Sequence, residues 1–149
     1  GGAERETSLH LLGQDPRVTT QRKLEADLAT GLIPASGDSP TVVMIQCVES
    51  RNDTNPYCSR VCCAEAVKNA LAISLKPRAR VIVLARDVRT YGFRETYFQQ
   101  AREAGVLFVR YPQGQDPEVS TSDGRLEVRV RDAAAGADLL GKRDDVYML

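Results

Sequence analysis

Three short apolar runs separated by two helical patterns dominate the sequence between residues 41 and 111. The runs are residues 41–48, 80–85 and 106–111. Their β-branched and aliphatic residues predict strands buried on both faces of a sheet. Residues 58–76 carry an apolar stripe with i+4 spacing, and residues 94–104 form a second helical pattern that Gly105 closes. The alternation predicts parallel strands with right-handed crossovers.

This alternation predicts the fold class. Strand, helix, strand, helix, strand is half of a doubly wound nucleotide-binding fold, so we expect an α/β, Rossmann-like three-layer domain over residues 41–149. Residues 118–120 and 126–131 alternate on either side of a Ser-Asp-Gly turn and predict a C-terminal β-hairpin. Residues 144–149 can supply a last short strand.

The first 40 residues are polar and are predicted to form a leader outside that domain. Their one amphipathic pattern, residues 19–28, predicts a short helix that a threonine caps and that has Leu24 and Leu28 on one face.

The charge and hydropathy of the chain give no sign of binding to nucleic acid or of a membrane span. Lys plus Arg number 20 and Asp plus Glu also number 20, so no net field favours nucleic acid or an anionic membrane surface. No apolar run approaches the roughly 18–20 residues that span a bilayer, and residues 1–12 lack the pattern of a signal peptide. We therefore expect a cytoplasmic protein with no membrane span.

All four cysteines lie between positions 47 and 63: Cys47, Cys58, Cys62 and Cys63. Two disulfides confined to so short a segment would constrain almost none of the chain, so the grouping favours metal binding or redox activity. The segment is the turn where a dinucleotide domain carries G-x-G-x-x-G, yet it contains no glycine. The position of a cofactor site is kept, and thiols replace its glycines.

Thiolates suit an iron–sulfur cluster or zinc, and a helix N-terminus favours their negative charge. Cys62 and Cys63 diverge by ~100° around a helix, which suits separate iron corners better than one zinc ion, and no C-x-x-C pair is present. Two alternatives stay open. One is a zinc-stabilised module that docks other subunits, and the other is a thiol–disulfide protein with Cys58 as nucleophile. Cys63 also fits a buried core position.

Other residues near the expected site have two interpretations each. Arginines in or beside the strand-end turns either donate hydrogen bonds to a cluster or lie exposed in loops: Arg51, Arg60, Arg86 and Arg89. Tyr57 either shields a cluster from water or simply packs. Tyr97 and Phe98 are expected in the core, and His10 is assigned no role.

The segment 47–63, with the core N-P-Y-C-S-R-V-C-C, resembles the A-subunit family of heterodisulfide reductases. Further segments resemble the same family, and the resemblance covers about residues 15–131: R-V-T-T-Q with L-E near residues 17–25, R-D-V-R-T-Y-G at residues 86–92, and residues 101–110.

The resemblance implies a thioredoxin-reductase-like flavoprotein whose NAD(P)-type domain holds a [4Fe-4S] cluster through Cys47, Cys58, Cys62 and Cys63. It implies electron relay among FAD, clusters and partner subunits, with residues 1–40 a remnant of the connection to a flavin domain. FAD is expected in the full-length family protein and not in this chain, which by itself is not expected to be a complete oxidoreductase. The family usually has glycine where this chain has Glu49.

Overall fold

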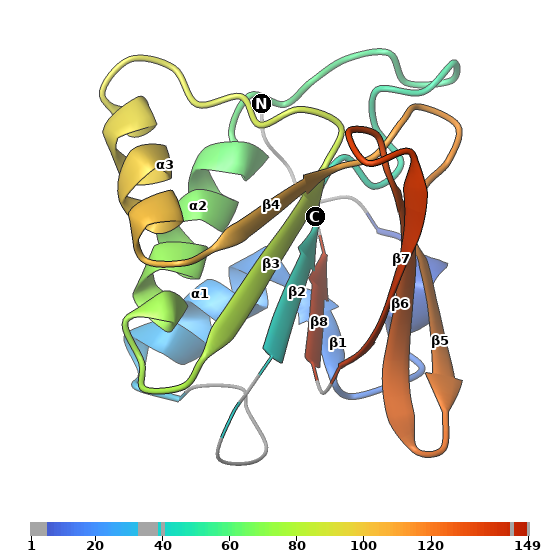
Figure 1. Cartoon of the computed structure of the whole chain (residues 1–149), viewed down its shortest axis with the longest axis horizontal. Coiled ribbons are helices and arrows are strands. Elements are labelled where there is room, and N and C mark those ends of the chain that lie inside the picture. Colours follow the sequence, from blue (N-terminus) through green and yellow to red (C-terminus); the bar gives the residue numbers. More distant parts are fainter. Residues whose placement is uncertain (1–5, 33–38, 40, 144, 149) are drawn as a thin grey trace.

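A five-stranded parallel sheet forms the centre of the molecule in the computed structural model, which describes residues 6–32, 39, 41–143 and 145–148 (Figure 1). Its strand order is β1-β8-β2-β3-β4. The strands are β1 (Val18–Thr20), β2 (Thr41–Ile45), β3 (Arg80–Ala85), β4 (Leu107–Arg110) and β8 (Asp145–Met148). All three predicted strands are therefore present, and the fold class is α/β.

The central sheet is covered differently on its two faces (Figure 1). Three helices cover one face: α1 (Gln21–Ala29), α2 (Cys62–Ser74) and α3 (Arg94–Glu103). A second, antiparallel sheet covers the other face: β5 (Glu118–Ser122), β6 (Arg125–Asp132) and β7 (Ala137–Arg143). The predicted hairpin is confirmed as β5–β6, and β7 extends it by one strand. A short 3-10 helix, η1 (Leu9–Leu11), precedes β1.

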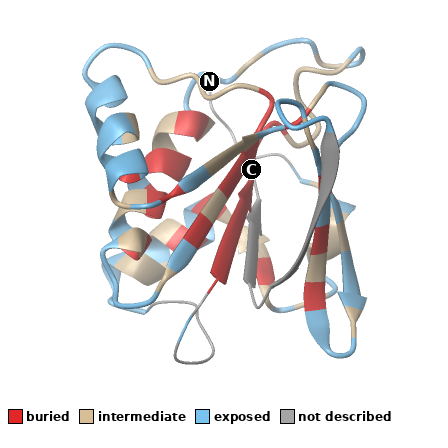
Figure 2. Ribbon diagram, in the orientation of Figure 1, coloured by how far each residue is buried: buried red, intermediate tan, exposed pale blue. Residues whose placement is uncertain are grey.

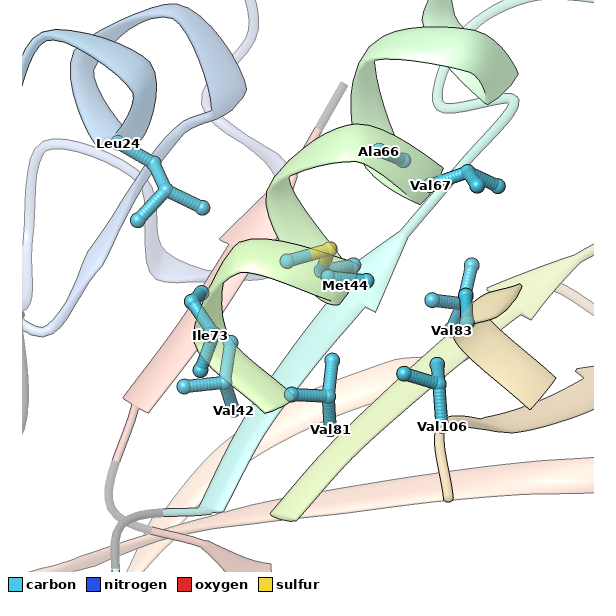
Figure 3. Close-up of a cluster of buried hydrophobic side chains, with 11 residues drawn as sticks. Leu24, Val42, Met44, Ala66, Val67, Ile73, Val81, Val83 and Val106 are labelled. Atoms are coloured by element: carbon cyan, nitrogen blue, oxygen red, sulfur yellow. The ribbon is translucent and has the colours of Figure 1, made fainter. Parts of the chain in front are cut away.

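The alternation of side chains along β2 creates two cores. Val42 and Met44 point toward the helices and pack with Ile73 (Figure 3), whereas Val43 and Ile45 face the antiparallel sheet. Every residue of β2 is buried, as Figure 2 shows. Each fully buried aliphatic side chain contributes about 1.5–3 kcal/mol, so this strand anchors the residues that follow it.

Helix α2 begins later than the sequence predicts. It starts at Cys62 with Val61 as the preceding residue, so Cys58 lies in the loop and the prediction of a helix from residue 58 is wrong. The cause is local, because Arg60 has a left-handed backbone (φ 61°) that a helix cannot continue through. Cys63 is buried as the stripe predicts, but Leu75 is 72% exposed at the helix end.

The segment predicted as a leader packs into the same sheet. The Thr20 side chain accepts a hydrogen bond from the Lys23 N–H (3.3 Å), which confirms the threonine cap. Strand β1 pairs with β8, and Leu24 is fully buried in the helix-side core. Residues 18–29 therefore join the same α/β unit as β2, β3 and β4, across the predicted division at residue 40.

Helix α3 and its glycine end agree with the sequence, and Gly105 has a φ of 88°. Phe98 packs edge-on against Phe108 with ring centroids 4.7 Å apart. Tyr97 is 52% exposed, so its predicted place in the core is wrong. None of the helices in the described part of the chain is both long and apolar enough to cross a membrane.

Candidate metal centre

Two loops meet at the carboxyl end of the central sheet (Figure 1). The loop of residues 46–61, called here the cysteine loop, follows β2 and carries Cys47 and Cys58. Helix α2 then begins with Cys62 and Cys63, and residues 86–93 follow β3. Carboxyl ends of parallel strands are where α/β sheets bind ligands, so the thiols lie at the expected edge.

The four cysteines are free thiols that differ in environment. Cys47 and Cys63 are buried, whereas Cys58 and Cys62 are half-buried. Cys62 and Cys63 share a side-chain hydrogen bond, and Cys47 lies close enough to interact electrostatically with both. Within the described residues, no three or more His, Cys, Asp or Glu side chains are arranged to hold a metal ion. The structure therefore groups three thiols without forming a finished metal site.

The pKa values of Cys47, Cys62 and Cys63 are shifted, because burial disfavours their thiolates and because Cys62 and Cys63 share a hydrogen bond. The hydrogen bond from Cys63 lowers the pKa of Cys62 to about 6, although burial opposes this shift. The same hydrogen bond, together with burial, raises the pKa of Cys63. Burial raises the pKa of Cys47, and hydrogen bonds from the Arg86 backbone and the Arg51 side chain oppose it. The shared hydrogen bond thus makes Cys62 the more acidic thiol of the adjacent pair.

The donors around the thiols fit a thiolate-ligated anionic group. Backbone N–H groups of Arg86, Arg89 and Arg60 face Cys47, Cys63 and Cys58, the last at 3.4 Å. The buried Arg86 Nε has no hydrogen-bond partner in the described structure. Donors to sulfur stabilise ligated thiolates, and an orphaned buried cationic donor fits a bound anion beside it.

Two of the four predicted arginines share one carboxylate partner. Arg51 and Arg89 both ion-pair with Asp87, the latter at 2.8 Å, and Arg51 also reaches Cys47. Burial would raise the pKa of Asp87, but the hydrogen bonds from the two arginines more than offset it and lower that pKa. Arg60 is exposed. Asp87 is not singled out by the sequence, although it adjoins Arg86 there.

Arg86 and Tyr57 have opposite environments. The Arg86 side chain is only 7% exposed and contacts the cysteine loop, with its guanidinium over the ring of Tyr111. Tyr57 is 77% exposed. Tyr111 and Asp116, which contact Arg86, are not identified from the sequence, because nothing near them in the chain marks them.

The backbone of the cysteine loop is unusual. Cys47, Glu49 and Arg51 have φ values of 65°, 50° and 57°, in the left-handed region. Such a conformation costs non-glycine residues roughly 1–2 kcal/mol each. The position where glycine is expected therefore has a backbone that glycine favours, but carries Glu49.

A cavity of about 400 Å³ lies beside this loop, on the side of the antiparallel sheet. Its lining includes His10, Val48, Glu49, Tyr111 and Asp116. Burial lowers the pKa of His10, although the charge of Asp116 opposes this. No sequence pattern places His10 here, because the contact joins distant segments.

No family model matches the chain, but curated relatives do. Over 101 residues it is 45% identical to the A subunit of the ferredoxin:CoB-CoM heterodisulfide reductase of Methanosarcina acetivorans, covering 64% of this chain and 12% of that protein. Over 144 residues it is 33% identical to the second iron-sulfur A subunit of the CoB–CoM heterodisulfide reductase of Methanopyrus kandleri, covering 89% and 21%. The A subunit of a Methanococcus maripaludis H2/formate:CoB-CoM heterodisulfide,ferredoxin reductase is 39% identical over 112 residues, covering 69% and 16%. The chain thus spans a small part of each relative.

Proposed function

The chain is homologous to one region of the A subunits of heterodisulfide reductases, and we propose that it is an electron-transfer domain of an oxidoreductase of that kind. The resemblance found in the sequence is thereby confirmed for this region. In the proposal, Cys47, Cys58, Cys62 and Cys63 hold a [4Fe-4S] cluster. Such a cluster supplies one-electron redox chemistry when bound.

One observation supports the proposal: Cys47 and the adjacent pair Cys62–Cys63, from two separate segments, lie together at the carboxyl edge of the sheet, among N–H donors. The protein would bring the ligands together, provide donors to their sulfurs and exclude water from Cys47 and Cys63, which are 5% and 4% exposed. Cys58 would join them from the cysteine loop. Because Cys58 precedes α2, it can approach the others without the helix moving.

The proposal also includes the type of α/β fold. We assign the α/β unit to the Rossmann-like NAD(P)-domain type found in thioredoxin reductases. Its support is the parallel order of β2, β3 and β4 and the thiols in the turn after β2. FAD would then be bound elsewhere in a full-length protein, and the partners would be the flavin domain or other reductase subunits. Free thiols suit a reducing compartment such as the cytoplasm.

A thiol–disulfide function is the second candidate, and the hydrogen bond between Cys62 and Cys63 favours it. The lowered pKa of Cys62 makes that residue the nucleophile, in place of Cys58 as expected from the sequence. Adjacent cysteines do not readily form a disulfide with each other, so Cys47 would be the partner thiol.

The deciding experiment measures iron, acid-labile sulfide and zinc per chain after anaerobic purification. Wild type is compared with Cys62→Ala and with Ser74→Ala, a matched control at the other end of α2. About four irons and four sulfides, lost in Cys62→Ala alone, are expected. Stoichiometric zinc without iron would contradict the proposal and favour the zinc-stabilised interaction module. A Cys47–Cys62 disulfide with neither metal would favour the second candidate.

A further inference from the structure

We propose that Arg86 is the positioning residue of the candidate centre, because its guanidinium holds the backbone of the cysteine loop next to Cys47. The relevance of this role to a cluster rests on the proposed function, whereas the contacts themselves do not. Arg86 directly follows β3, so it acts from the strand that neighbours β2.

The guanidinium holds the loop through two carbonyl groups. Arg86 Nη1 donates to the carbonyl oxygens of Ser50, at 3.1 Å, and of Arg51. The backbone N–H of Ser50 in turn donates to the Cys47 carbonyl at 3.2 Å. One buried cation therefore binds the chain three and four residues beyond Cys47. Hydrogen bonds from a charged donor are stronger than those between neutral groups, so two of them can hold a loop in place.

Tyr111 holds the other side of Cys47 and also supports Arg86. Its hydroxyl donates to the Gln46 carbonyl at 2.5 Å, and its N–H donates to the Ala85 carbonyl at 3.1 Å. The guanidinium lies 5.9 Å from the centre of the Tyr111 ring. Asp116 accepts from Arg86 Nη2 at 2.9 Å and orients it. The residues on both sides of Cys47 are thus fixed to the end of β3 and to the segment after β4.

The loop needs such support because its backbone conformation is costly. Cys47, Glu49 and Arg51 all have the left-handed backbone that side chains disfavour, and such a backbone persists only where surrounding contacts determine it. Without Arg86, the carbonyls of Ser50 and Arg51 would lose their buried donor and the segment would relax. The expected consequence is a Cys47 no longer held beside Cys62 and Cys63.

The test compares Arg86→Lys and Arg86→Gln with wild type, in the metal-free full chain, by hydrogen exchange. Lysine keeps the charge but lacks the planar guanidinium that bridges two carbonyls and Asp116. It is therefore not expected to restore the protection of the loop amides. Arg94→Gln, an exposed arginine at the start of α3, is the matched control. Amides of residues 47–52 are expected to exchange about tenfold faster in both Arg86 variants, while β2 and β3 amides stay unchanged.

A second measurement separates this inference from the proposed function. If wild type takes up iron, both Arg86 variants are expected to lose it while Arg94→Gln retains it. Faster exchange with no iron in wild type would leave the positioning role intact and end the cluster proposal. Unchanged exchange at residues 47–52, or equal acceleration throughout the chain, would overturn the positioning role even if wild type carries a cluster.

Discussion

Replacing Glu49 with glycine is expected to leave the chain more stable than replacing it with alanine, although glycine is usually the more destabilising of the two. The φ of Glu49 is 50°, and relieving a left-handed non-glycine residue gains roughly 1–2 kcal/mol. Glycine loses more backbone entropy on folding than alanine, by roughly 0.5–1 kcal/mol. The expected net gain over an alanine at the same site is therefore about 1 kcal/mol, or a rise in Tm of about 3 °C for a chain of this length.

The comparison that isolates the backbone effect is Glu49→Gly against Glu49→Ala. Both variants remove the carboxylate and its interactions, and only alanine keeps a Cβ at the left-handed position. Asp53 provides a matched pair in the same loop, because its φ is not positive. There, glycine is expected to be less stable than alanine by roughly 0.5–1 kcal/mol. Urea unfolding followed by circular dichroism gives all four free energies of unfolding.

The decisive result is the difference in free energy of unfolding between the glycine and alanine variants. It is expected to favour glycine at Glu49 and alanine at Asp53. If Glu49→Gly is no more stable than Glu49→Ala, the left-handed conformation at Glu49 is not a cost to the folded chain. The cysteine loop would then store no strain at this residue, and Arg86 would not be needed to hold a strained backbone there.

Two further predictions test the thiol group and the unity of the fold. In the metal-free chain, alkylation of Cys62 is expected to rise with pH to half its maximum at about pH 6, because the hydrogen bond from Cys63 favours the thiolate. Mass spectrometry of the labelled peptides measures this, and a midpoint at the ordinary thiol pKa would contradict it. Leu24→Ala is expected to lower the free energy of unfolding by roughly 2–5 kcal/mol in a single transition, because Leu24 is fully buried in the core that α2 shares. A neutral effect in urea unfolding would show that residues before β2 are not part of that core.

Strands β2, β3 and β4 of the central sheet and the β5–β6 hairpin could be predicted because their signals are local, whereas β1 is not predicted. The apolar runs of β2, β3 and β4 and the Ser-Asp-Gly turn of the hairpin are each contained in a few residues. The place of β8 could not be predicted, since its pairing between β1 and β2 depends on segments more than 90 residues away. The start of α2 is predicted too early because i+4 spacing at Cys58 and Cys62 looks helical, while the left-handed Arg60 between them is invisible in the sequence.

In the candidate site too, local signals could be predicted and tertiary contacts could not. The four cysteines stand out by residue type and spacing, and Arg51 and Arg86 stand out by following strands. The contacts that give Arg86 its environment come from Tyr111 and Asp116, which approach it only when β4 pairs with β3. Sequence patterns identify which groups carry chemistry, whereas the tertiary contacts decide which of them hold the others in place.

Under the proposed function, the turn after β2 would be an anion-binding edge that has changed its ligand. A dinucleotide domain brings backbone N–H groups close to phosphates by means of glycines. Around the cysteine loop, N–H groups at Arg60, Arg86 and Arg89 face sulfur instead, and left-handed residues other than glycine form the turn. A thiolate-ligated cluster is also anionic, so the same edge would keep its electrostatic preference while exchanging phosphate for sulfur. A loop that holds a cluster would not need glycine for close approach to a pyrophosphate, but it would need a side chain such as Arg86 to maintain its shape.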